Sequence, residues 1–180
     1  LDLLNRSVKD NKYFKLSGHF NNEQFRKAEG VGSCGGPYSN HLLALAKYAS
    51  SVGKSSVGFV RGTYYETNAV LDQCKKYGME VIQVPSAEFS DETLELQFST
   101  THPNYAWIKM GGSSSLGIQG AQAIANLIPE EIQRVHLAVG TGGTIAGLSS
   151  VCDKPCLGYE VVYSGSWKEN HAVSEFIQAT

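Results

Sequence analysis

Short β-rich segments alternate with helical segments after residue 30, and this alternation limits the fold more than any other feature of the sequence. The segment 79–84 (MEVIQV) shows it well, because Gly78 separates it from the helical segment 67–77 and Pro85 follows it. Glycine and proline are typical stops for helices and strands at such positions. Strands that alternate with helices form βαβ units with parallel strands. The sequence therefore predicts an α/β fold of parallel sheets flanked by helices.

The same patterns place the individual elements and a domain division. Strands are predicted at 57–61, 79–84, 105–110, 134–139 and 157–163, and helices at 42–48, 67–77, 91–99, 116–127, 143–151 and 168–178. The polar, proline-bearing segment 99–104 is the best candidate for a crossing between domains. We therefore predict a small αβα domain at 31–103 and a partial larger domain formed by 1–30 together with 104–180.

Composition and charge limit the classes of partner that the chain is expected to bind. The 180 residues are 42% hydrophobic with a formal charge of -2, which predicts a soluble globular protein of one or two small domains. The Lys75-Lys76 pair is the largest basic cluster, so nucleic acid and anionic membranes are not expected as partners. No apolar run approaches the ~20 residues that span a bilayer.

The cysteines and histidines show neither a disulfide framework nor the spacing of metal ligands. The 4 cysteines include the isolated pair Cys152 and Cys156, with no second pair and no histidine pair spaced for zinc. Histidines such as His19 are interpreted as surface or hydrogen-bonded core residues. We therefore predict no metal site, reduced thiols and a cytoplasmic protein.

A glycine-rich loop follows the predicted strand 134–139 in the segment VHLAVGTGGTIAGL. Gly140, Thr141, Gly142, Gly143 and Thr144 lie directly before a predicted helix. Glycines let backbone N–H groups converge, and threonine hydroxyls add donors, so this pattern is typical of a phosphate site. The structural alternative is a tight strand-to-helix turn that needs glycine. We favour phosphate binding because glycine and threonine fill all five positions.

A dinucleotide-binding oxidoreductase is the main rival interpretation of this loop. Gly140 and Gly142 fit the first half of the nicotinamide or flavin fingerprint, although Ile145 stands at its third glycine position. Glu160, at the end of the next strand, lies near the place of the ribose-binding acid. The loop alone therefore leaves a nicotinamide or flavin enzyme open.

A second motif, GGPYSNH, precedes the helix at 42–48. Ser39 and Asn40 are good N-cap residues, which explains a strand-to-helix turn without any function. The functional alternative is that Ser39, Asn40, His41 and the free N–H groups of the helix face an anionic ligand. The motif alone favours the structural interpretation.

Several stretches together resemble the pyridoxal-phosphate enzymes grouped as 1-aminocyclopropane-1-carboxylate deaminase and D-cysteine desulfhydrase. They are DNKYFKL (10–16), GGPYSNHLLALA (35–46), GGSSSLGIQGAQAI (111–124) and LAVGTGGTIAGL (137–148). The resemblance covers about residues 8 to 165 and implies the tryptophan-synthase-β-like fold with two open αβα subdomains. It departs from the family at Asp10, where glycine is expected, and at Met110, where an acidic residue is common.

The resemblance implies pyridoxal 5'-phosphate as cofactor and a role for each motif. Lys12 would form the Schiff base with the cofactor and later serve as a base. Asn40 would hydrogen-bond the ring oxygen of the cofactor. Ser39 and His41 would hold the substrate carboxylate or take part in proton transfer. Residues 140–144 would cradle the phosphate.

The implied reaction is β-elimination or ring opening of a small amino acid to a 2-oxo acid and ammonia. His41, in the third position of its Ser-Asn-x block, is closer to the desulfhydrases than to the deaminases. Family members are usually dimers, so the resemblance implies a homodimer. They also continue beyond the position of Thr180, so we expect a truncated chain, and a non-catalytic fragment that keeps only the phosphate site is a further alternative.

Overall fold

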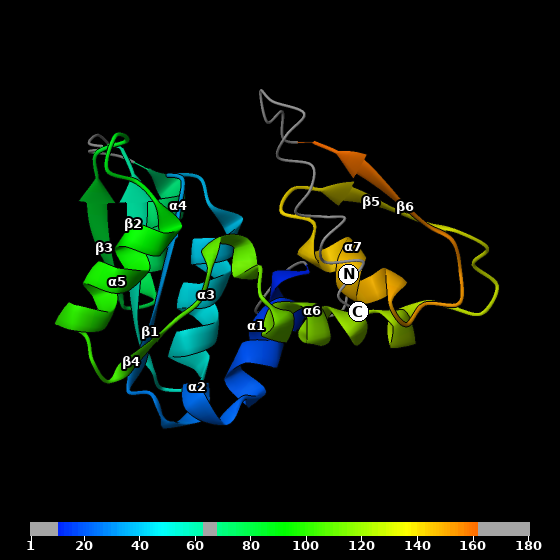
Figure 1. The fold of residues 1–180 in the computed structure, drawn as a ribbon, viewed down its shortest axis with the longest axis horizontal. Helices are drawn as coiled ribbons and strands as arrows, with labels where there is room; N and C mark the ends of the chain where they lie inside the picture. Colours follow the sequence, from blue (N-terminus) through cyan, green and yellow to red (C-terminus); the bar gives the residue numbers. More distant parts are fainter. Residues whose placement is uncertain (1–10, 63–67, 162–180) are drawn as a thin grey trace.

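The computed structural model describes residues 11–62 and 68–161, in which two parallel sheets lie at either end of a stack of helices (Figure 1). The larger sheet has four strands in the order β3-β2-β1-β4, all parallel. Their bounds are Gly30–Gly35 (β1), Ser55–Arg61 (β2), Met79–Val84 (β3) and Tyr105–Trp107 (β4). This arrangement confirms the predicted parallel sheet with helical crossovers.

Helices cover both faces of the four-stranded sheet. On one face α3 (Asn40–Ser51) and α4 (Ala69–Lys76) bury a core that includes Leu45, and on the other α5 (Asp91–Thr101) buries Phe98. Gly32 of β1 is needed for the second contact, because a Cβ there would lie 2.5 Å from the Phe98 ring. Every residue of β1 is buried, so this strand forms the centre of the unit.

A stack of three helices leads from this unit to the second sheet. Helix α1 (Lys12–Asn21), which the short α2 (Glu23–Lys27) follows, packs on α6 (Ser115–Gln122), and α6 packs on α7 (Gly143–Ser149). Glycines allow the backbones to approach closely: a Cβ on Gly120 would lie 2.1 Å from the carbonyl oxygen of Phe14. A Cβ on Gly147 would lie 2.3 Å from the carbonyl oxygen of Ile118.

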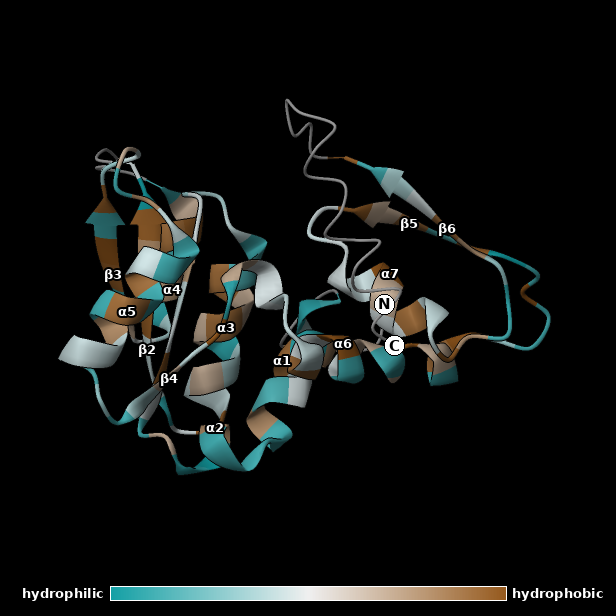
Figure 2. Ribbon diagram, viewed as in Figure 1, coloured by the Kyte–Doolittle hydropathy of each residue, from teal (hydrophilic) through white to brown (hydrophobic). Residues whose placement is uncertain are grey.

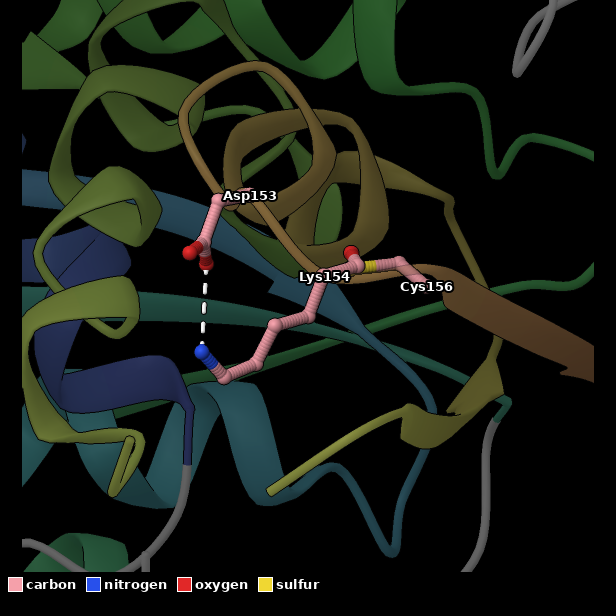
Figure 3. Close-up of polar contacts among 3 residues, drawn as sticks. All are labelled: Asp153, Lys154 and Cys156. Atoms are coloured by element: carbon pink, nitrogen blue, oxygen red, sulfur yellow. Dashed lines mark hydrogen bonds and ion pairs between the residues drawn. The ribbon is translucent and has the colours of Figure 1, made fainter. Parts of the chain in front are cut away.

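The second sheet pairs β5 (Val135–Val139) with β6 (Cys156–Glu160) in parallel. Two short 3-10 turns, η1 (Met110–Gly112) and η2 (Ala125–Leu127), flank α6. The turn into β6 carries an ion pair between Lys154 Nζ and Asp153 Oδ1 at 3.3 Å, and the Cys156 thiol donates to the Lys154 carbonyl at 3.5 Å (Figure 3). Asp153 is 84% exposed, so this pair stabilises the turn little.

The predicted strands are present, with three corrections to neighbouring segments. The predicted strand 105–110 ends at Trp107, because Met110 already belongs to η1. The predicted helix 116–127 is split into α6 and η2. The crossing predicted at 99–104 is wrong, because this segment connects α5 to β4 within one sheet. The predicted helix 168–178 lies outside the described residues.

The division into 31–103 and 1–30 plus 104–180 remains a prediction. The pairing of β4 argues against the exact boundary of this division. The division assigns β4 to the larger domain, but β4 pairs with β1 through Gly30–Tyr105 and Gly32–Trp107. Between residues 11 and 62 and between 68 and 161, no helix has the length and apolar character to cross a membrane.

Candidate active site

Lys12, the first residue of α1, lines two cavities. The larger, of about 430 Å³, is also lined by residues 35–41, Met110 and Gly111. The smaller, of about 200 Å³, is lined by Asn11 together with residues of the glycine loop and its flanks: 138–142, Thr144 and Ile145. The two sequence motifs therefore meet at one lysine, although about 100 residues separate them along the chain.

The turn before α3 forms one wall of the larger cavity. Ser39 is the N-cap of α3, and its hydroxyl accepts a hydrogen bond from the Leu42 amide at 3.2 Å. The Ser39 amide in turn donates to the Gly36 carbonyl at 3.1 Å. Asn40 is exposed at the first position of the helix. The wall therefore offers polar side chains beside the positive end of a helix of 12 residues.

His41, the second residue of α3, also lines the larger cavity and is almost completely buried. Its Nε2 is 2.9 Å from the Ser33 hydroxyl of β1, and its Nδ1 has no hydrogen-bond partner among the described residues. Burial, with smaller contributions from Lys12, Lys15 and His19, lowers the pKa of His41 to about 3. His41 is therefore a neutral imidazole near pH 7, able to hydrogen-bond a ligand but not to offer it a positive charge.

The glycine loop begins where β5 ends and leads directly into α7. Gly142, the N-cap of α7, has a φ of 77°, which favours glycine. The Asn11 side chain donates to the Thr144 hydroxyl, so the loop is held against the start of α1. Gly143 is buried, and a Cβ there would lie 2.7 Å from Lys15 Nζ. Glycine at 143 thus leaves space for a second lysine.

Lys15 is the residue that sequence reasoning missed. Its side chain is 1% exposed, and its Nζ donates to the Gly111 carbonyl at 3.0 Å. Burial first, and the charge of Lys12 second, lower its pKa from 10.5 to about 7. The signal was its spacing: residues three apart share a helix face, so Lys12 places Lys15 beside the same site.

The turn between β4 and α6 also contributes residues to the site. Gly111 and Gly112 both have positive φ, at 70° and 67°. A Cβ on Gly112 would lie 3.4 Å from Lys15 Cβ and 3.7 Å from His41 Cε1, so this turn packs closely on both residues. The buried Ser113 hydroxyl next to it lacks a hydrogen-bond partner among the residues described, as does His41 Nδ1. The two buried polar side-chain atoms without a partner in the described part of the chain, His41 Nδ1 and Ser113 Oγ, therefore both belong to residues around the site.

Comparison with protein families identifies the chain. Residues 1–171 match the family model described as pyridoxal-phosphate dependent enzyme. The chain belongs to this family. The predicted family and cofactor class are therefore confirmed.

Two curated relatives of these pyridoxal-phosphate-dependent enzymes carry the name "Putative 1-aminocyclopropane-1-carboxylate deaminase". The protein from Thermotoga maritima is 32% identical over 130 residues, which are 67% of this chain and 42% of the relative. The protein from Pyrococcus furiosus is 27% identical over 161 residues, 82% of this chain and 48% of the relative. The chain thus spans less than half the length of these relatives.

Several solved structures share the fold of this chain. A crystal structure described as an ACC deaminase homologue matches with a TM-score of 0.77 at 23% identity, covering 98% of this chain and 58% of that one. The processed form of threonine deaminase isoform 2 from Solanum lycopersicum matches with a TM-score of 0.70 at 17% identity, covering 97% and 51%. These matches confirm a tryptophan-synthase-β-like fold of which the chain forms only part.

Proposed function

We propose that this chain forms the cofactor-binding part of a lyase or deaminase that converts a small amino acid to a 2-oxo acid and ammonia. The observation that carries the proposal is the position of Lys12 on both cavities. An amine at this place would reach the aldehyde of a cofactor whose phosphate is held by the residues of the smaller cavity, and the residues of the larger cavity would hold the substrate. The proposal assigns Lys12 as the covalent attachment point of pyridoxal 5'-phosphate.

The smaller cavity fits the phosphate of this cofactor. Gly140, Thr141, Gly142, Gly143 and Thr144 offer backbone N–H groups and hydroxyls, the usual ligands of phosphate. The buried Lys15 amine, packed against Gly143, would add a charge-assisted hydrogen bond. A phosphate there would also compensate the cost of burying a protonated lysine.

The larger cavity fits an amino-acid substrate. Ser39 and the N-terminus of α3 would hold its carboxylate, and Asn40 would hydrogen-bond the ring oxygen of the cofactor. When bound, pyridoxal phosphate supplies an electron sink for the substrate's α-carbon. His41, held neutral by burial, would use its unpartnered Nδ1 to bind or pass a proton, while Lys12 removes the α-proton.

The substrate itself follows from the relatives and from one side chain. The names of the curated relatives favour 1-aminocyclopropane-1-carboxylate. His41 after Ser39 and Asn40 favours D-cysteine. Pro37, Tyr38 and Met110 line the same cavity, and their apolar surfaces favour an uncharged side chain for either substrate. A homodimer and a cytoplasmic location remain predictions from the resemblance and from the cysteine pattern.

A spectroscopic titration tests the proposal. Pyridoxal phosphate added to the protein should produce a visible absorbance band of the lysine-bound cofactor, and Lys12→Ala should abolish it. Lys76→Ala, on the exposed side of α4, is the matched control and should keep the band. An equal band in Lys12→Ala would show that another lysine carries the cofactor.

The products separate the remaining alternatives. D-cysteine and 1-aminocyclopropane-1-carboxylate are added in turn, and ammonia and the 2-oxo acid are measured. A visible band without either product would favour the non-catalytic alternative. Binding of NADH with no visible band would instead favour the dinucleotide-binding oxidoreductase.

A further inference from the structure

Asp91, the first residue of α5, connects three elements through one carboxylate. Its Oδ1 accepts from Trp107 Nε1 at 2.9 Å and lies 3.5 Å from the Cys34 thiol. Its Oδ2 accepts from the Met110 backbone amide at 2.8 Å. Asp91 lines neither cavity at Lys12. Its contacts nevertheless lead directly to the site.

The contact with Met110 holds the turn on which the site depends. Met110 and Gly111 line the larger cavity, and the Gly111 carbonyl accepts from Lys15 Nζ at 3.0 Å. Gly111 and Gly112 have no side chains to pack, and both adopt positive φ. Hydrogen bonds must therefore fix this turn, and the bond from Met110 to Asp91 is one of them.

We infer that Asp91 is a positioning residue for the cofactor site: its carboxylate fixes the turn 110–112 and, through the Gly111 carbonyl, the amine of Lys15. This inference rests on the proposed function for the phosphate end of the site. This role also explains why residue 91 is an aspartate and not an asparagine. Two N–H donors meet the two oxygens of Asp91, and an asparagine would present an NH2 group to one of them.

Paired variants separate positioning from simple stability. Asp91→Asn weakens the contact with Met110 or with Trp107, whereas Trp107→Phe removes the indole donor together with part of the ring and keeps the Met110 bond. A second pair leaves Asp91 unchanged. Met110→Pro removes the amide hydrogen that Asp91 accepts, whereas Met110→Ala removes the methionine side chain and keeps this amide hydrogen. Lys109 has a ψ of 151°, a conformation that a following proline tolerates.

Two measurements are made on each variant of the full chain. Hydrogen exchange without cofactor reports the protection of the amides at 110–112, and a titration reports the dissociation constant for pyridoxal phosphate. Asp91→Asn should speed exchange at Met110 by about tenfold or more and weaken cofactor binding by about tenfold. Trp107→Phe should change both by less than about threefold. Met110→Pro should weaken binding more than Met110→Ala does.

The outcomes are distinct. Equal losses of affinity in Asp91→Asn and Trp107→Phe, or equal losses in the two Met110 variants, would show that Asp91 only stabilises the fold and would overturn the inference. Unchanged exchange at Met110 in Asp91→Asn would also overturn it. A wild-type protein that binds no pyridoxal phosphate would overturn the proposed function and this role together, and the titration of the wild type alone identifies that case.

Discussion

The two sheets that supply the site differ sharply in how they are packed. In the four-stranded sheet β1 is wholly buried, with helices on both faces. In the two-stranded sheet β5 alternates between half-buried and exposed residues, and β6 exposes Leu157 and Tyr159. In Figure 2, β2 and β3 carry brown, hydrophobic segments between the helices, whereas much of β6 is white to teal.

The difference indicates that the two ends of the site are held by different means. The turn before α3 is fixed by its own sheet, through β1 and the bond between Ser33 and His41. The glycine loop follows a weakly packed sheet and is fixed mainly by helices α1, α6 and α7 and by Lys15. Changes in the helix stack should therefore disturb the phosphate end more than changes in β5 or β6.

The largest expected effect is at Lys15, which touches both ends. Its pKa is lower in the folded state than in the unfolded chain, so the unfolded chain binds more protons between pH 7 and 10.5. The contribution of Lys15 to stability without cofactor must then rise with pH, by about 2 kcal/mol between about pH 7 and 9. Above about pH 9 the buried thiols of Cys34 and Cys74, whose pKa values burial raises, oppose this rise. Below about pH 7 the full cost of the buried charge remains.

Lys15→Met removes this dependence. Denaturant unfolding at the two pH values should show the rise in wild type and not in Lys15→Met. The variant should also bind pyridoxal phosphate about a hundredfold more weakly, because it lacks a hydrogen bond between charged groups. The same pH dependence in variant and wild type would mean that Lys15 is not the group that titrates.

The helix stack is tested next, at Gly120. A Cβ there would meet the Phe14 carbonyl oxygen at 2.1 Å and the Gly18 amide nitrogen at 2.9 Å, both backbone atoms that cannot move aside alone. Gly120→Ala should therefore cost about 2 kcal/mol, although alanine favours helices, and should weaken cofactor binding. Gln119→Ala, exposed on the same helix, is the control and should change stability by less than about 0.5 kcal/mol.

A smaller loss is expected at the other end, at Ser33. Ser33→Ala leaves His41 Nε2 buried without its hydroxyl partner, which should cost about 1–2 kcal/mol. Because the contact belongs to the four-stranded sheet, binding of inorganic phosphate at the glycine loop should stay unchanged. Thermal unfolding and a phosphate titration measure the two quantities. A loss of phosphate binding in this variant would show that the two ends are not independent.

The sequence predicted the regular parts of this architecture and missed the parts that depend on tertiary contact. Strands such as Met79–Val84 carry their own pattern and stops. Strand β1 was not predicted, because GVGSCG has few β-forming residues and gains its place by lying between β2 and β4. His19 was interpreted as either a surface or a hydrogen-bonded core residue, and the structure shows the second, with the side chain buried and bonded to Ser114.

The candidate site shows the same limit. The glycine loop was predicted from its own pattern, because glycine and threonine at successive positions have few other uses, whereas Lys12 was predicted only from the family resemblance. Asp91 carries no such local signal, and Lys15 has only its spacing of three residues from Lys12. Their proposed roles come from contacts with Gly111 and Met110, and the burial that lowers the pKa of Lys15 arises only when Gly112 and the start of α7 at Gly143 pack against it.

The smallest expected effect lies on the two-stranded sheet and tests the comparison most directly. Tyr159 of β6 is 53% exposed, and its hydroxyl lies 2.8 Å from His136 Nδ1 of β5, where the two rings are stacked. Tyr159→Phe keeps the stacking and removes the hydrogen bond, which water replaces on this exposed face, so stability should change by less than about 0.5 kcal/mol. Pyridoxal phosphate affinity should stay within about twofold, since the helices and not β6 hold the glycine loop. If the affinity instead falls as far as in Gly120→Ala, the loop depends on its own sheet, and the two ends of the site are held in the same way.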